Sequence, residues 1–413
     1  MLLTHFLLFS QTWLVHLNMQ QWTTDEAWLK TLGLRFNPFA HLESSTDPYL
    51  LRYIVTPFSL RPVWDDVSAL ILAPVGGGKT TLRLYSAWNS LRGLFSYFPI
   101  PYVLPQEWWH LPSGNILNHG NALGRATARN TLLLLATFPH VFLEMPQKKQ
   151  NELASLLAAM TDEYEWILAL WSDETWESLM ELLVEPSLIN SFAKPRSQDI
   201  KKTLLVLEKP SSLYDKDPFK LICRVFDFLI EQFNYHSIHI LLDGIDAFPE
   251  TSSSATSGAN WLQDWIDGFG TKFTSEYVRL KVFIPSEMEP IQGKNNLWQN
   301  ISRKRAKVVW NRANLVELLR RRVFIASNRI HETINGLCSD DIDDLEEILI
   351  ETIIQEGRPL PRELLALMQE IIRAHVLNDP DISFFTASNI ESGIFAYRQK
   401  LTEDSKPIPA LQS

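Results

Sequence analysis

The amino-acid sequence predicts an α/β protein in which a parallel β-sheet carries a helical insertion and is followed by a helical domain. Three observations lead to this prediction. Apolar runs of strand length alternate with helical patterns between residues 61 and 310, which is typical of parallel sheets. A glycine-rich loop, residues 73–80, joins one such strand to a helix. From residue 311 to about 400, apolar residues follow helical spacing throughout.

Five strands are expected in the sheet. The first four are short apolar runs at residues 68–72, 94–103, 238–242 and 278–284, and the last of these stops at Pro285. The fifth is the short run 308–310. The pattern from Thr80 onward indicates a helix between the first two strands. Residues 219–233 are expected to form an amphipathic helix directly before the third strand.

A helical insertion is expected because the two ends of the predicted core lie far apart in sequence. Lys79 and Asp243 are separated by 164 residues (243 − 79), where a minimal core needs only two helices and a strand. Residues 105–200 are mostly helical in pattern, with one helical run over 153–168. The insertion contains a concentration of tryptophans, which either build a local core or form a surface for a protein partner: Trp108, Trp109, Trp166, Trp171 and Trp176.

Composition limits the class of protein. A chain of 413 residues suggests two or three domains. With 38 Lys and Arg against 48 Asp and Glu, the net charge is −10, which disfavours a protein that mainly coats DNA or an anionic membrane. The only cysteines are Cys223 and Cys338, which excludes a disulfide framework and favours a cytoplasmic location.

The N-terminal segment is apolar but does not have the features of a signal peptide. Residues 1–18 lack a basic start and a cleavage site, and they are shorter than the ~20 residues that span a bilayer. We expect them to be a doubtful extension, with translation beginning at Met19. A membrane anchor or an ordinary packed helix remain alternatives.

The loop Ala73-Pro-Val-Gly-Gly-Gly-Lys-Thr80 fits the phosphate-binding P-loop pattern with Ala in place of the first Gly. Gly76, Gly77 and Gly78 allow the backbone N–H groups to turn inward around a β-phosphate. Lys79 would reach the β- and γ-phosphates, and the hydroxyl of Thr80, which Thr81 follows, would ligate Mg²⁺. The helix N-terminus favours the same anions. The loop therefore predicts binding of ATP and Mg²⁺.

An acidic strand end is expected to complete the metal site. Asp243 ends the apolar run 238–242, and Asp246 follows three residues later. Asp243 would hold the metal, and Asp246 would orient or deprotonate an attacking water. Gly244 occupies the place directly after Asp243, where many ATPases of this architecture have Glu, so nucleotide binding is better supported than hydrolysis.

Together, the loop and the Leu241–Asp246 segment (LLDGID) resemble the AAA+/STAND branch of P-loop ATPases. Residues 33–39 (GLRFNPF) are similar to the entry segment of transposition-type AAA+ ATPases, which helps to enclose the adenine. Residues 357–365 (GRPLPRELL) look like the start of the lid helix in such proteins, where an arginine contacts the γ-phosphate. Both Arg358 and Arg362 fit that role. The chain also resembles uncharacterised bacterial ATP-binding proteins, which implies only fold and ATP binding.

This resemblance implies an organisation and further site residues. The doubtful extension 1–18 precedes an entry segment at 19–60, a core at 61–310, a helical lid at 311–403 and a flexible tail at 404–413. Ser286 would sense the γ-phosphate. Arg303 or Arg305 would act as an arginine finger in a neighbouring subunit.

The leading hypothesis is an ATP- and Mg²⁺-dependent conformational switch that forms a homo-oligomer or docks a protein partner through the insertion. One alternative is a nucleotide-gated, STAND-like scaffold with negligible hydrolysis. Another is a DNA-associated AAA+ ATPase, which the net charge of −10 disfavours.

Overall fold

The computed structural model describes residues 26–55, 60–93, 95–104, 116–172, 174–211, 216–247, 255–273, 276–288, 301 and 303–404. The extension 1–18, Trp108, Trp109 and nearly all of the tail lie outside these residues. Internal contacts divide the chain into two units. Among the described residues, unit 1 contains residues 26–43, 52–55 and 310–404, and unit 2 contains residues 44–51 and those between 60 and 309.

Unit 2 is built on a five-stranded sheet with the order β2-β3-β4-β1-β5, in which every pairing is parallel. The predicted α/β fold with a parallel sheet is therefore confirmed. The strands are β1 (Ala69–Ala73), β2 (Tyr97–Val103), β3 (Ser237–Asp243), β4 (Val278–Pro285) and β5 (Arg305–Lys307).

The predicted position of the fifth strand is wrong by three residues. β5 pairs with β1 from Arg305 to Lys307, and only the N–H of Val308 continues the pairing, by donating to Leu72 at 2.8 Å. Within this edge strand only Ala306 is buried, so it has no continuous apolar run that sequence analysis could detect.

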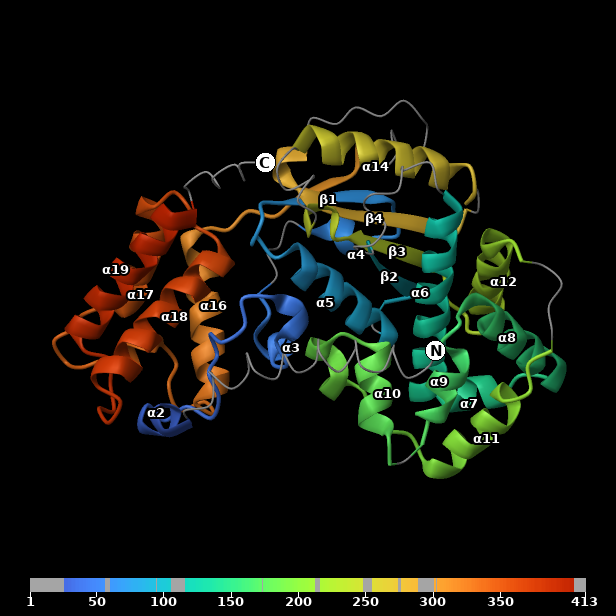
Figure 1. Ribbon diagram of the computed structural model, residues 1–413, viewed down its shortest axis with the longest axis horizontal. Helices are drawn as coiled ribbons and strands as arrows, with labels where there is room; N and C mark the ends of the chain where they lie inside the picture. Colours follow the sequence, from blue (N-terminus) through green and yellow to red (C-terminus); the bar gives the residue numbers. More distant parts are fainter. Residues whose placement is uncertain are drawn as a thin grey trace, which may run out of the picture. The chain divides into compact units, whose positions relative to one another are not determined.

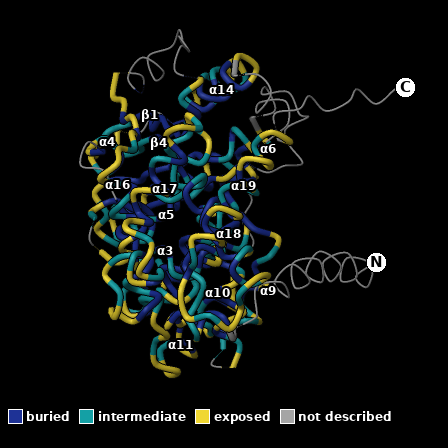
Figure 2. The backbone as a smooth tube through the Cα atoms, turned by 90° about the vertical axis from the view of Figure 1, so that its left-hand side faces the viewer, coloured by how far each residue is buried: buried dark blue, intermediate teal, exposed yellow. Residues whose placement is uncertain are grey.

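Helices cover both faces of the sheet, as burial of parallel strands requires. Figures 1 and 2 show α14 (Ala255–Gly270) above the strands and α5 (Lys79–Leu91) below them. Leu70 and Leu72 of β1 join a core cluster that includes residues of α14, whereas Ala69 and Ile71 are equally buried but lie outside it. β1 and β3 are buried along their whole length.

Every described element between β2 and β3 is helical. In order they are α6 (Ile116–Thr137), α7 (Pro139–Leu143), α8 (Gln147–Met160), α9 (Tyr164–Ala169), α10 (Trp176–Leu183), the 3-10 turn η3 (Pro186–Ser191), α11 (Ser197–Leu207) and α12 (Pro218–Glu231). The single helix expected over 153–168 is wrong, because Thr161 is extended (φ −141°, ψ 129°) and ends α8. Trp171 and Trp176 belong to the same core cluster as the sheet, and Trp166 is 52% exposed.

Unit 1 is helical and has its own core. Its long helices are α16 (Arg312–Ala326), α17 (Leu345–Gln355), α18 (Pro361–Asn378) and α19 (Ala387–Asp404). Asn311 and Asp344 cap α16 and α17 by accepting hydrogen bonds from backbone N–H groups. The expectation of helix throughout is wrong between α16 and α17, where only the short turn η6 (Ile334–Leu337) forms.

The N-terminal part of the chain packs within unit 1. The short helix α2 (Glu26–Thr31) places Trp28 and Leu29 in the core that the C-terminal helices form, and Phe39 joins them. The guanidinium of Arg322 donates to the carbonyl of Pro38 and lies 4.2 Å from the ring centroid of Tyr53, at the end of α3 (Leu50–Tyr53). Among the described residues, no helix has both the length and the apolar character needed to cross a membrane.

Candidate functional site

The glycine loop, residues 73–80, connects the end of β1 to the start of α5. Gly76 (φ 79°) and Gly78 (φ 94°) have left-handed backbones, which residues with a side chain rarely adopt. Gly77 is required for a different reason. A Cβ there would lie 2.9 Å from the carbonyl oxygen of Pro74, which accepts the Gly77 N–H. All three glycines are therefore needed for this loop conformation.

Lys79, the first residue of α5, is buried and its ammonium group points at Asp246. The Nζ lies 2.9 Å from a carboxylate oxygen of Asp246, and the two side chains are 6% and 17% exposed. It also lies near the carbonyl oxygens of Ala73 (3.4 Å) and Pro74 (3.5 Å). Asp246 is placed by the 3-10 turn η4 (Ile245–Ala247), directly after β3. This charge pair brings the glycine loop and the acidic strand end together.

Thr80 and Asp243 also meet at this edge of the sheet. The Thr80 hydroxyl donates to Oδ2 of Asp243 at 3.0 Å, and the backbone N–H of Gly244 donates to Oδ1 at 2.9 Å. Hydroxyl and carboxylate oxygens are suitable ligands for Mg²⁺. Gly244, which directly follows Asp243, has φ 91°, a left-handed backbone that strongly favours Gly.

Two further residues belong to this site and were not predicted from the sequence, Arg83 and Glu185. Nε of Arg83 donates to Oδ2 of Asp243 at 2.9 Å, while Nη1 and Nη2 donate to the two oxygens of Glu185 at 2.5 and 2.9 Å. Arg83 lies one helical turn after Lys79, so i, i+4 spacing was a signal for it. Glu185 is 102 residues further along the chain, and no local pattern indicates it.

Arg83 is a buried cation held between two carboxylates. Its side chain is 2% exposed. Burial favours a lower pKa for its guanidinium, but the charges and hydrogen bonds of Glu185 and Asp243 outweigh burial and raise the pKa above its ordinary value. Arg83 therefore supplies a fixed positive charge beside Asp243, the residue that ends β3.

The other predicted residues of unit 2 are distributed around the sheet. Ser286 follows Pro285, the β4 partner of Ala73, and its buried hydroxyl has no hydrogen-bond partner among the described residues. The hydroxyl of Thr81 lies 2.5 Å from that of Ser44. Arg305 pairs with Leu70, near the start of β1 and therefore away from the end that carries the glycine loop. Arg303 is exposed just before β5.

Arg358 and Arg362 belong to unit 1, where each has an acidic partner. Arg358 lies 3.4 Å from Glu363, and Arg362 lies 2.8 Å from Glu43.

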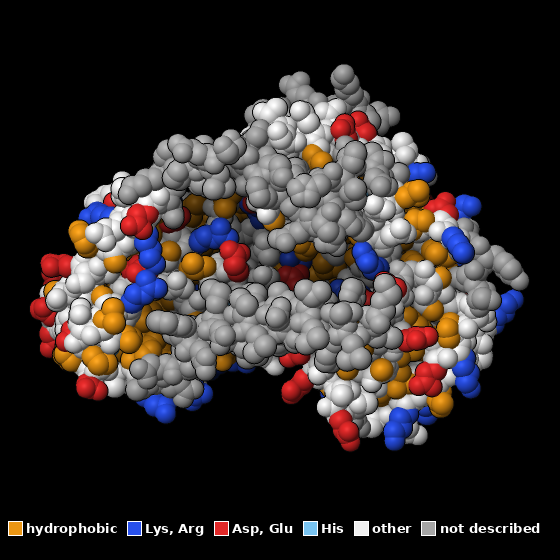
Figure 3. All heavy atoms as spheres, viewed as in Figure 1, with side chains coloured by type: hydrophobic (Ala, Val, Ile, Leu, Met, Phe, Trp, Pro, Cys, Tyr) orange, Lys and Arg blue, Asp and Glu red, His pale blue; other side chains and the backbone are white. Residues whose placement is uncertain are grey.

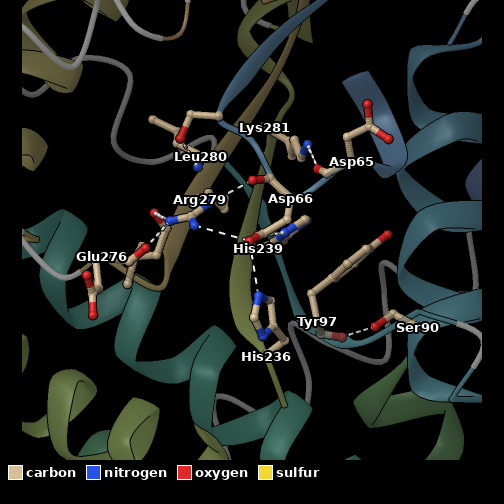
Figure 4. Close-up of polar contacts among 12 residues, drawn as sticks. Asp65, Asp66, Ser90, Tyr97, His236, His239, Glu276, Arg279, Leu280 and Lys281 are labelled. Atoms are coloured by element: carbon tan, nitrogen blue, oxygen red, sulfur yellow. Dashed lines mark hydrogen bonds and ion pairs between the residues drawn. The ribbon is translucent and has the colours of Figure 1, made fainter. Parts of the chain in front are cut away.

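A second polar cluster lies toward the opposite ends of the strands (Figure 4). Nε2 of the fully buried His239 is 3.2 Å from Asp66, and Arg279 donates to the same carboxylate at 3.1 Å. The hydrogen bond from His239 is the main cause that holds the pKa of Asp66 below its usual range. Burial lowers the pKa of His239 to about 4 and that of Lys281 to about 7.

The Lys281 amino group is held by main-chain oxygens. Its Nζ donates to the carbonyls of Pro62 and Asp65, both at 2.6 Å, and thereby ties the end of α4 (Arg61–Trp64) to the sheet. Among the described residues, no group of three or more His, Cys, Asp or Glu side chains could hold a metal ion.

Comparisons with known proteins give no assignment: no protein-family model matches the chain, and no curated protein or solved structure matches it.

Proposed function

We propose that the chain binds ATP with Mg²⁺ at the glycine loop and uses the nucleotide as a conformational switch. The observation that carries this proposal is the convergence of Lys79, Thr80 and Asp243. These residues lie at the carboxyl ends of β1 and β3, in a sheet where the chain leaves β1 for the far strand β2 and returns through β3 and β4. Open parallel sheets bind ligands outside the carboxyl ends of their strands at such a switch point.

Each residue has a chemical role in this proposal. The N–H groups of residues 76–78 and the N-terminus of α5 surround the phosphates, and Lys79 exchanges Asp246 for phosphate oxygens. Thr80 and Asp243 fit Mg²⁺ because they offer hard oxygen atoms side by side, and the metal would neutralise phosphate charge. Asp246, once released by Lys79, would orient or deprotonate a water.

The first test is nucleotide binding by the full chain. Lys79→Ala should abolish Mg-ATP binding in a calorimetric titration, because the phosphates lose the buried cation. Lys149→Ala is the matched control, since Lys149 is 41% exposed on α8 and pairs weakly with Glu152 at 3.9 Å. Unchanged affinity in Lys79→Ala would overturn the proposal.

Whether the switch is reset by hydrolysis depends on Asp246. A glutamate at position 244 would have to adopt the left-handed backbone that Gly244 has. We therefore assign the action on water to Asp246, whose carboxylate lies 2.9 Å from the Nζ of Lys79. A switch that hydrolyses ATP predicts phosphate release that Asp246→Asn abolishes. The scaffold alternative predicts copurifying nucleotide and negligible release that this substitution does not change.

An oligomeric ATPase would need Arg303 or Arg305 from a neighbouring copy. Both side chains are exposed at or just before the edge strand β5. We therefore expect phosphate release per subunit to rise with protein concentration and to collapse in Arg305→Ala or Arg303→Ala. Release that is independent of concentration and unaffected by both substitutions would exclude such a finger.

The DNA-associated alternative has less support. On the face drawn in Figure 3, Lys and Arg side chains are interspersed with Asp and Glu, and the whole chain carries a net charge of −10. Proteins that bind DNA through its phosphates usually present a field of positive charge. The lid role of Arg358 or Arg362 stays a prediction, which nucleotide affinities of Arg358→Ala and Arg362→Ala would test.

A further inference from the structure

The carboxylate of Asp243 is held by donors from three places. Gly244 N–H binds Oδ1, while Thr80 Oγ1 and Arg83 Nε both bind Oδ2. The orientation of this carboxylate is therefore set by its neighbours before any metal binds. Outer partners of this kind commonly tune how strongly a ligand holds a metal.

Arg83 connects Asp243 to the helical insertion. Only its Nε contacts Asp243, and the two terminal nitrogens donate to the two oxygens of Glu185. Glu185 lies between α10 and η3, and it lines a cavity of about 590 Å³ between α5, α6 and α10. The side chain of Glu185 is 28% exposed, compared with 2% for Arg83. The chain of contacts thus runs from the buried strand end to a partly exposed residue of the insertion.

Planar guanidinium geometry determines what Glu185 does for Asp243. Arginine has five N–H donors in a fixed fork that fits a carboxylate with two hydrogen bonds. With Glu185 in place, the fork faces Glu185. Without it, the buried guanidinium would seek a second carboxylate, and Asp243 is the one already in contact. Two donors on Asp243 would then compete with a metal for its oxygen atoms.

We propose that Arg83 and Glu185 are positioning residues for Asp243, and that Glu185 keeps Asp243 available to Mg²⁺ by holding the Arg83 fork away from it. This inference rests on the proposed function. It makes the helical insertion a regulator of metal loading, because any movement of Glu185 changes the contacts of Asp243. By linkage, Mg²⁺ binding must equally favour the conformation of the insertion in which Glu185 holds Arg83.

The test separates nucleotide binding from metal binding. ATP affinity is measured by calorimetry in excess EDTA, and Mg²⁺ affinity is then measured at saturating ATP, for wild type and Glu185→Gln. We expect at least a tenfold weaker Mg²⁺ affinity in the variant, in the range of other outer-partner substitutions. The ATP affinity in EDTA should stay within about twofold, because no metal is present to compete.

The insertion offers a matched control. Arg129 and Glu163 form a similar two-pronged pair, with Nε to Oε2 at 2.8 Å and Nη2 to Oε1 at 2.7 Å, and this pair does not contact Asp243. Glu163→Gln should leave Mg²⁺ affinity unchanged. Hydrogen exchange gives an independent measurement: addition of Mg²⁺ to the ATP complex should slow exchange over residues 179–191 in wild type but not in Glu185→Gln.

The outcomes distinguish this inference from the proposed function. If Glu185→Gln keeps the Mg²⁺ affinity of Glu163→Gln, the pair with Arg83 is only structural and the inference is overturned. If Glu185→Gln does not fold, Arg83→Lys decides, because a lysine cannot bridge both carboxylates in the same way; unchanged Mg²⁺ affinity in that variant overturns the inference. If wild type binds no ATP, both proposals fail.

Discussion

Asp246→Asn should make ATP bind more tightly, because it weakens the pair that phosphate must displace. Lys79 and Asp246 lie 2.9 Å apart, and only 6% and 17% of their side chains are exposed. A hydrogen bond to a charged group contributes about 1.5–3 kcal/mol net. We assign about half of this to the carboxylate charge, because the amide oxygen of the variant can still accept a hydrogen bond from Lys79. The substitution should therefore remove roughly 0.8–1.5 kcal/mol of competition, or about 4-fold to about 12-fold in ATP affinity.

The assay is an ATP titration in excess EDTA, so that no metal affects the comparison between Asp246→Asn and wild type. Asp162→Asn is the control, because it changes the net charge equally at an exposed position between α8 and α9. Tighter binding in Asp246→Asn alone would agree with phosphate displacing Asp246 from Lys79. Weaker ATP binding in Asp246→Asn would mean that Asp246 itself contacts the nucleotide. Equal binding would mean that the pair between Lys79 and Asp246 does not oppose nucleotide binding. Either result would refute the prediction.

Two further predictions concern stability. Gly393→Ala should destabilise unit 1 by about 3 kcal/mol, because the added Cβ on α19 would lie 2.5 Å from the Cα of Ile371 on α18. The control Ser392→Ala changes an exposed neighbour and should have little effect on the melting temperature. Equal melting temperatures of the two variants would contradict this prediction. Lys281 has a pKa lowered by burial to about 7 in the folded state and one of about 10.4 when unfolded. The unfolded state thus binds more protons between these values, so stability should rise with pH there by up to about 1.4 kcal/mol per pH unit. The free energy of unfolding, measured by urea denaturation between these pH values, should lose this pH dependence in Lys281→Met and keep it in Lys202→Met. The same pH dependence in wild type and both variants would be inconsistent with a neutral buried Lys281.

The strands that could be predicted from sequence are those buried on both faces. β1, β3 and β4 are almost entirely buried, so their residues form continuous apolar runs. β2 also lies at an edge of the sheet, but it is mostly buried and was predicted. β5 was not predicted at its position because it buries only Ala306. The break between α8 and α9 was not predicted, because apolar residues continue at helical spacing across the extended Thr161.

The residues of the candidate site also differ in whether a local sequence pattern could predict them. Lys79 and Thr80 lie in one motif, and Asp243 and Asp246 lie in another. Each motif was recognised locally, and their meeting was predicted because a P-loop needs a carboxylate at the end of a neighbouring strand to hold its metal. Glu185 comes from neither motif, because only the fold of the insertion brings it to Arg83. Contacts between residues 102 positions apart depend on tertiary packing, which a local sequence pattern does not contain.

Two buried basic side chains of unit 2 show how the partners of a side chain indicate its role. Lys281 is held by the main-chain carbonyls of Pro62 and Asp65. These acceptors are fixed by the backbone, so Lys281 has the structural role of tying α4 to the sheet. Arg83 is held by two carboxylates from β3 and the insertion. Buried ion pairs contribute little net stability compared with apolar packing, so stability alone gives a weak reason for this arrangement. A charge shared between two side chains can change partner when a metal competes for one of them, and this is the property that a switch requires.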